Sequence, residues 1–258
     1  MAKAFILAGL KFHIETETPM KEFMWRPGST LRPPVVADST ILVKEMVVPA
    51  SASVKVIDSF QTQSSTSLSS SGGTVVSTVT NISEAAAKDT DATYTWLATN
   101  PHNGSVRALS TDSQKRSRGI GIRISALEWT VPASMTDMSA MDFFELRVAQ
   151  GTRHPNTVAL NGGANFTIIL RDALGIEARV SSSAQGEAVN QPYQRIGDGS
   201  GLGWQNDFRT IRLRLRDFQG GGTGLKLSMI SSVRIEVGGS FGSSLGRFIM
   251  DDLQFTKE

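Results

Sequence analysis

Cysteine is absent from this chain of 258 residues. Its absence excludes a disulfide framework and any zinc site built from thiolates. No apolar run approaches the roughly 18–20 residues that a membrane-spanning helix needs, so we expect no membrane partner. The formal net charge is only +2, and aromatic residues make up 7% of the chain. The dense basic patch with interleaved aromatic residues that is typical of nucleic-acid-binding proteins is therefore not expected.

Glycine, by contrast, is plentiful at 24 residues, and serine and threonine are frequent. This composition favours many short strands joined by tight turns over long helices. Apolar residues make up 40% and charged residues 19% of the chain, which is typical of a folded globular protein. A chain of this length can bury a core of its own, as one large domain or as one domain with an appendage.

Residues 1–50 differ from the rest of the chain. The apolar residues Phe5, Leu10 and Ile14 recur at helical spacing and predict an amphipathic helix rather than a signal peptide. A proline-rich segment follows, containing Pro19, Pro27, Pro33 and Pro34. Prolines at this density exclude helix interiors and central strands, so the segment must run extended over a surface. We therefore expect an N-terminal helix with an extended arm or linker at 1–50, followed by a β-sandwich at 51–258.

From about residue 54 onward, apolar and polar residues alternate with the period of two that is typical of β-strands. We expect strands at residues 54–60, 74–82, 105–110, 119–131, 142–150, 165–172, 178–183, 208–218, 231–239 and 247–255. Residues 83–92 form the only other helix-like stretch, and DALG at 172–175 predicts a tight hairpin turn. About ten strands separated by turn signals predict an all-β sandwich of antiparallel sheets.

A resemblance to a known family is carried by FRTIRLRLRDF (208–218) and by LSMISSVRIEVGGSFGSSLGRFIMDDLQF (227–255). Together these segments resemble the last three strands of galactose-binding-like jelly rolls. Many carbohydrate-binding modules have this fold. The resemblance implies that the sandwich is a jelly roll of two antiparallel sheets and that its ligand is a polysaccharide or another glycan.

A longer similarity also includes residues 126–150 and 165–183. With the segments above, they resemble a β-sandwich that lies C-terminal to the catalytic domain in some bacterial secreted α/β-hydrolases. AFILAGLKFHI (4–14) resembles the closing helix of such a hydrolase. The catalytic portion is absent, so no hydrolase residue carries over. The similarity implies an accessory domain that is secreted as part of a larger protein, with an α/β-hydrolase catalytic domain as its partner.

One formal catalytic motif occurs, the pattern G-x-S-x-G at residues 238–242. A nucleophile elbow needs a strand before it and a helix after it, whereas the residues after this pattern predict a turn into another strand. His13, His102 and His154 all precede the pattern, although histidine follows serine in α/β-hydrolases. We therefore assign no catalytic residue and expect no enzyme.

Asp251 and Asp252 are adjacent acids in the last predicted strand, where alternation places one carboxylate on each face. Jelly-roll binding modules often hold a structural Ca²⁺ near this strand, and oxygen ligands suit this ion. By resemblance, Asp251 would be the side-chain ligand, and Asp58 on the first strand could contribute. Alternatively, these acids accept hydrogen bonds from neighbouring backbone amides or pair with a surface arginine.

A glycine-rich loop at residues 197–207 carries Trp204. A tryptophan on a loop can stack on a sugar ring, and Tyr193, Asn206 and Asp207 are nearby hydrogen-bonding groups. Alternatively, Trp204 folds back and covers one end of the core. Trp129 alternates with polar neighbours, so we expect it to face the core.

Arg212, Arg214 and Arg216 alternate with apolar residues and predict a row of arginines on the outward face of a strand. Such a row can bind an anionic ligand. More often it is a solvated face that is balanced by acidic residues on neighbouring strands.

Two functions follow from these observations. The first is a non-catalytic, carbohydrate-binding-like accessory module, which predicts that Trp204 or Trp96 is exposed. The second is a structural or interaction domain that packs on an α/β-hydrolase domain and stabilises it without a ligand, which predicts buried tryptophans.

Overall fold

The part of the chain that the structure, a computed structural model, describes contains eleven strands in two antiparallel sheets and a few short helical turns. That part comprises residues 53–60, 66–78, 82–85, 106–110, 125–150, 164–184, 189, 209–238, 242 and 247–257. The predicted N-terminal helix and proline-rich arm at 1–50 lie outside it. No helix long and apolar enough to cross a membrane occurs among these residues.

One sheet has six strands. Along its main path these are β3 (Ile82–Ala85), β4 (Val106–Ser110), β11 (Arg247–Thr256), β6 (Phe143–Gln150) and β9 (Arg209–Arg214), and β1 (Val54–Asp58) also pairs with β11. The other sheet has five strands in the order β2 (Val75–Ser77), β5 (Ser125–Thr130), β10 (Ile230–Val237), β7 (Thr167–Asp172) and β8 (Glu177–Ser181).

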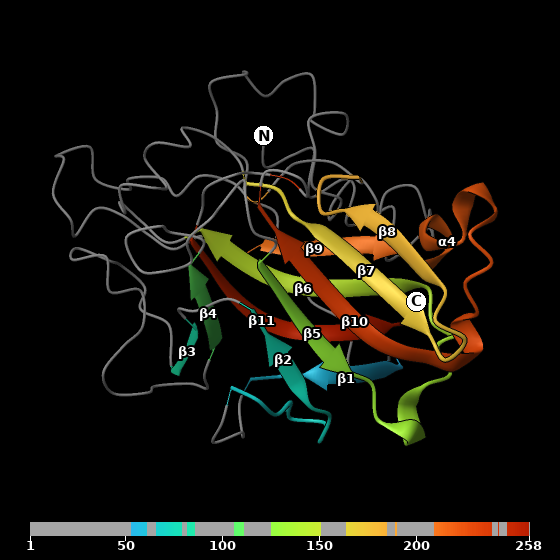
Figure 1. The fold of residues 1–258 in the computed structure, drawn as a ribbon, viewed down its shortest axis with the longest axis horizontal. Helices are drawn as coiled ribbons and strands as arrows, with labels where there is room; N and C mark the ends of the chain where they lie inside the picture. Colours follow the sequence, from blue (N-terminus) through green and yellow to red (C-terminus); the bar gives the residue numbers. More distant parts are fainter. Residues whose placement is uncertain are drawn as a thin grey trace, which may run out of the picture.

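From β5 to β11 the chain passes repeatedly between the two sheets, with the β7–β8 hairpin as the only consecutive pair in one sheet (Figure 1). This crossing pattern is that of a jelly-roll sandwich. The predicted fold class is therefore confirmed. The tight turn predicted at 172–175 joins β7 to β8, and the Gly175 amide donates to the Asp172 carbonyl at 3.0 Å.

The core lies between the sheets because the apolar residues of each strand alternate with polar ones. Trp129 is fully buried, as predicted. Phe166 and Phe248 form an edge-to-face pair with ring centroids 5.5 Å apart, and Phe144 and Phe255 form another at 5.8 Å. The first of these pairs joins the segment that leads into β7 to strand β11, and so connects the two sheets.

Two sequence predictions of secondary structure were wrong for part of their described residues. The strand predicted at 208–218 ends at Arg214, and Leu215–Phe218 forms the short helix α4, which buries Leu215 and Phe218 at helical spacing. Residues 83–85 of the helix-like stretch at 83–92 belong to β3 instead, and residues 86–92 lie outside the described part of the chain. In β3, the antiparallel pairing of Ile82–Ala85 with β4 outweighs the helix propensity of alanine and glutamate.

The loop before β2 packs so closely on β5 that it requires glycine. A Cβ atom added to Gly73 would lie 2.0 Å from the carbonyl oxygen of Thr130, which is backbone and cannot move aside easily. We expect Gly73→Ala to lower the free energy of unfolding by about 2–3 kcal/mol, measured by urea denaturation. Gly220→Ala is the matched control because no atom lies within 4 Å of its added Cβ. Equal losses in both variants would show that the predicted contact is absent.

Candidate functional site

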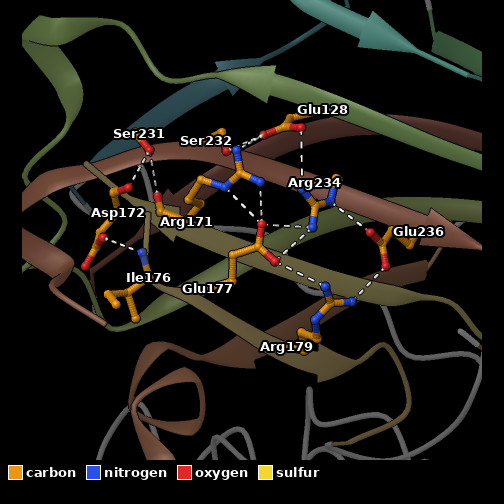
Figure 2. A network of polar contacts seen from close by, with 10 residues as sticks. All are labelled: Glu128, Arg171, Asp172, Ile176, Glu177, Arg179, Ser231, Ser232, Arg234 and Glu236. Atoms are coloured by element: carbon orange, nitrogen blue, oxygen red, sulfur yellow. Dashed lines mark hydrogen bonds and ion pairs between the residues drawn. The ribbon is translucent and has the colours of Figure 1, made fainter. Parts of the chain in front are cut away.

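The outer face of the five-stranded sheet carries a network of acidic and basic side chains (Figure 2). It consists of Glu128, Arg171, Glu177, Arg179, Ser232, Arg234 and Glu236. These residues come from β5, β7, β8 and β10, and they alternate with core residues such as Val233 and Ile235. The network therefore lies on the solvent side of this sheet.

Glu177 is the centre of this network. Its carboxylate accepts hydrogen bonds from Arg171 Nε at 2.9 Å, Arg234 Nη2 at 3.0 Å and Arg179 Nη2 at 3.1 Å. Partial burial raises the pKa of Glu177, but Arg171 and Arg234 outweigh it and hold this pKa below its usual value. Three arginines therefore balance three glutamates, and the network is a structural feature of the sheet.

An apolar residue lies beneath these charges. Ile169 points to the same face of β7 and pairs in register with Arg234 on β10 and with Arg179 on β8. It is only 1% exposed. The aliphatic stems of the arginines can cover such a residue while their guanidinium groups pair with carboxylates.

The outer face of the six-stranded sheet carries a second polar cluster, which is centred on Glu145. This buried carboxylate accepts hydrogen bonds from Arg212 Nε at 2.9 Å, Thr256 Oγ1 at 2.9 Å and Gln254 Nε2 at 3.1 Å. The Arg212 guanidinium also stacks on the ring of Phe143, 3.4 Å from its centroid. Arg212 is therefore fixed by cross-strand partners.

The predicted row of three arginines is confirmed only in part. Arg212 has the cross-strand acid that was expected of a balanced face. Arg214 pairs with Asp217 at 3.2 Å. Arg216 lies on α4, because the strand ends before it, and does not continue the row.

Beside this cluster, the six-stranded sheet has a gap among its described residues, between the two strands that pair with one edge of β11. Strand β11 pairs with β4 through Arg247–Met250 and with β1 through Leu253–Thr256, so Asp251 and Asp252 lie between these two neighbours. A β-bulge shifts the register with β6 at this point, and Asp252 has a left-handed φ of 46°. Such backbone strain and bulges often occur at binding sites, where they redirect side chains.

The bulge turns both carboxylates toward one arginine. Arg147 Nη1 lies 3.5 Å from Asp251 Oδ2 and 3.5 Å from Asp252 Oδ2. The side chains of Arg147 and Asp252 are 34% and 37% exposed, whereas that of Asp251 is 13% exposed. The prediction that the two acids point to opposite faces was wrong, because the left-handed residue interrupts the alternation of the strand.

Asp58 points to the interior. It is fully buried, and it accepts hydrogen bonds from the Phe60 amide at 3.0 Å, the Ser70 amide at 3.2 Å and Trp129 Nε1 at 2.9 Å. The structure therefore does not bring Asp58 together with Asp251, which faces Arg147 on the outer side.

Asp58 thus accepts hydrogen bonds from backbone amides, and Asp251 pairs with an arginine. These are the partners that the sequence suggests as the alternative to a calcium site. Within the described ranges, no group of three or more histidine, cysteine, aspartate or glutamate residues could hold a metal ion. Calcium binding by Asp251 and Asp58 stays a prediction.

The predicted sugar-binding residues Trp204, Tyr193, Asn206 and Asp207 lie outside the described residues. Every aromatic ring in the described part of the chain is buried. A stacking platform for a sugar must therefore come from elsewhere in the chain.

The start of β9 connects the predicted loop to the sheet gap. Thr210 on β9 is the register partner of Arg147, and Arg147 is the partner of Asp251. Asp207 precedes Thr210 by three residues, and three residues span at most about 11 Å. In sequence, the predicted sugar-binding loop therefore ends three residues before Thr210, the first residue of the row Thr210–Arg147–Asp251, and the pairing of this row is not evident from the sequence alone.

The G-x-S-x-G pattern at 238–242 follows β10, and the next described strand is β11. Residues 239–241 and 243–246 lie outside the described residues, so the turn predicted there stays a prediction.

No protein-family model matches this sequence, and no curated protein matches it. It is similar to the solved family 11 carbohydrate-binding module of a cellulosomal cellulase of Clostridium thermocellum, with 12% identity, 80% of this chain and 95% of that chain covered, and a TM-score of 0.41. A family 30 carbohydrate-binding module is 14% identical to this chain. That match covers 71% of this chain and 88% of the module, with a TM-score of 0.42. An exo-β-agarase is 11% identical to this chain. That match covers 79% of this chain and 25% of the agarase chain, with a TM-score of 0.44. At such low identities and TM-scores, the similarities do not decide what this chain binds.

Proposed function

We propose that this chain is a carbohydrate-binding-like accessory module whose glycan site lies at the gap of the six-stranded sheet. The observation that carries the proposal is the row Thr210–Arg147–Asp251, which lies beside the strained bulge at Asp252 and at the start of β9. The same strand follows directly on the loop that holds Trp204.

The chemistry of this row suits sugar hydroxyls. A guanidinium group donates hydrogen bonds in a fixed fork, and carboxylate oxygens accept them. Arg147 and Asp252 are each about one-third exposed and so accessible to a ligand. In this proposal they hydrogen-bond the sugar hydroxyls while Trp204 stacks on an apolar sugar face. Tyr193, Asn206 and Asp207 supply further hydrogen bonds.

The proposed role is non-catalytic. The module would hold a larger exported protein, with its catalytic domain, on a polysaccharide. The alternative is a structural domain that packs on a hydrolase domain without a ligand, and the burial of Trp129 and of the other described aromatic rings favours it.

We expect Trp204→Ala to weaken binding by about tenfold or more, which is typical of removing a stacking tryptophan from a binding site. Affinity electrophoresis of the full chain in gels that contain single soluble polysaccharides measures this effect. Leu174→Ala is the control, because Leu174 is 69% exposed on the β7–β8 turn and apart from the proposed site.

The proposal requires that at least one polysaccharide retards the wild type and the Leu174 variant alike and the Trp204 variant much less. If no polysaccharide retards the folded wild type, the structural alternative replaces it. If the Trp204 variant is retarded as much as the wild type, Trp204 does not stack on the sugar.

A further inference from the structure

Four methionines gather at one end of the sandwich. Met135, Met138 and Met141 lie three residues apart in the connection between β5 and β6, residues 131–142. Met229 ends the 3₁₀-helix η6 (Leu227–Met229) in the connection between β9 and β10. The Met138 amide donates to the Leu227 carbonyl at 2.7 Å, so the two connections are joined.

The β5–β6 connection binds both sheets. The Val131 amide donates to the Ser231 carbonyl on β10 at 2.9 Å, and the Asp142 amide donates to the Thr256 carbonyl on β11 at 2.9 Å. Its Thr136 carbonyl accepts from the Ile230 amide at 2.8 Å. Loosening this connection would therefore weaken the attachment of one sheet to the other.

The four side chains differ in their surroundings. Met138 is fully buried in the hydrophobic core. Met135 and Met141 are partly exposed and pack against that core. Met229 is also partly exposed, but it does not belong to the core or to the residues packed against it.

We propose that Met135 and Met141 are oxidation sites that make the stability of the sandwich sensitive to hydrogen peroxide. The peroxide transfers one oxygen atom to the thioether sulfur, which loses two electrons and becomes a sulfoxide, while the peroxide is reduced to water. A sulfoxide is polar and cannot keep the apolar packing of a thioether. In a chain without cysteine, methionine is the only sulfur-containing side chain open to this reaction.

The test treats the folded chain with hydrogen peroxide, locates sulfoxides by peptide mass spectrometry and measures Tm by circular dichroism. In the wild type, Met135, Met141 and Met229 are oxidised while Met138 is protected, and Tm falls by about 4 °C or more. A double variant, Met135→Leu with Met141→Leu, should lose much less Tm than the wild type although Met229 is still oxidised. Leucine conserves the volume of methionine, so this variant should fold.

Met229→Leu is the matched control, and its Tm should fall on oxidation as far as that of the wild type. The methionines outside the described residues are present in every variant, so their oxidation cancels in the comparison. The proposal is overturned if the double variant loses as much Tm as the wild type. It is also overturned if Met138 is oxidised as fast as Met135, because oxidation would then report general unfolding. If the double variant does not fold, the two single variants replace it, and each should retain part of the wild-type Tm loss.

Discussion

Asp58→Ala should lower the free energy of unfolding by about 4 kcal/mol, because it leaves buried N–H donors without their acceptor and each such donor costs roughly 1–3 kcal/mol. The donors are the Phe60 amide, the Ser70 amide and the Trp129 indole, and Asp58 itself is fully buried. Guanidinium denaturation followed by circular dichroism measures the loss. A loss below about 1 kcal/mol would show that this carboxylate does not support the core.

The same variant separates a structural role from calcium binding. If Asp58 acts only through its hydrogen bonds, the loss is the same in calcium and in EDTA. If Asp58 is a calcium ligand, calcium stabilises the wild type but not the variant. Trp129→Phe is the control for the indole bond, because it removes this one donor while Asp58 keeps its two amide donors, and it should therefore cost less than Asp58→Ala.

Asp172→Asn should lower the free energy of unfolding by about 2–3 kcal/mol at pH 7. Asp172 is buried at the end of β7, and its Oδ1 accepts from the amides of Leu174 and Ile176, both at 2.9 Å. Its Oδ2 accepts from the Lys226 amide at 3.0 Å, which attaches the β9–β10 connection to this turn. Asparagine retains one acceptor oxygen, but its amide group would face one of these N–H donors.

The effect of this substitution depends on pH. Burial raises the pKa of Asp172, but the three backbone donors and the nearby Lys226 outweigh it, so this pKa lies below its usual value. Because the folded pKa is lowered, the stabilisation is present above the unfolded value of about 3.9 and is lost as pH falls toward the folded pKa.

Urea midpoints measured between pH 7 and pH 3 should therefore fall less steeply for Asp172→Asn than for the wild type. The remaining slope includes Glu177, whose pKa is also lowered. Parallel curves for the Asp172 variant and the wild type would contradict this role.

Much of the sandwich could be predicted because strands on a half-buried sheet alternate apolar and polar residues. The strands predicted at 142–150, 165–172 and 231–239 correspond to β6, β7 and β10 within two residues. The end of β9 could also have been found. Had the strand continued, Asp217 would have faced the core, whereas Leu215 and Phe218 have the spacing of one helical turn.

The site could be predicted only in part, because its geometry depends on register and on strain. Aspartate is among the residues that tolerate left-handed φ, so the adjacent acids at 251–252 gave a signal for a bulge. The inward direction of Asp58 could not be read from sequence, because its partner Trp129 lies 71 residues away. The pairing of Arg147 with Thr210 and Asp251 could not be read from the sequence either, because it follows from the register of three strands, β9, β6 and β11.

The glycan site at the sheet gap is tested most directly by comparing two arginine variants. Arg147→Ala removes a guanidinium that faces Asp251 and Asp252 on the six-stranded sheet, and Arg179→Ala removes one that faces Glu177 and Glu236 on the other sheet. Isothermal titration with the polysaccharide that retards the wild type most should show a Kd about tenfold higher for Arg147→Ala. The Kd of Arg179→Ala should remain that of the wild type. An unchanged Kd for Arg147→Ala, or an increase only for Arg179→Ala, would contradict the proposed site.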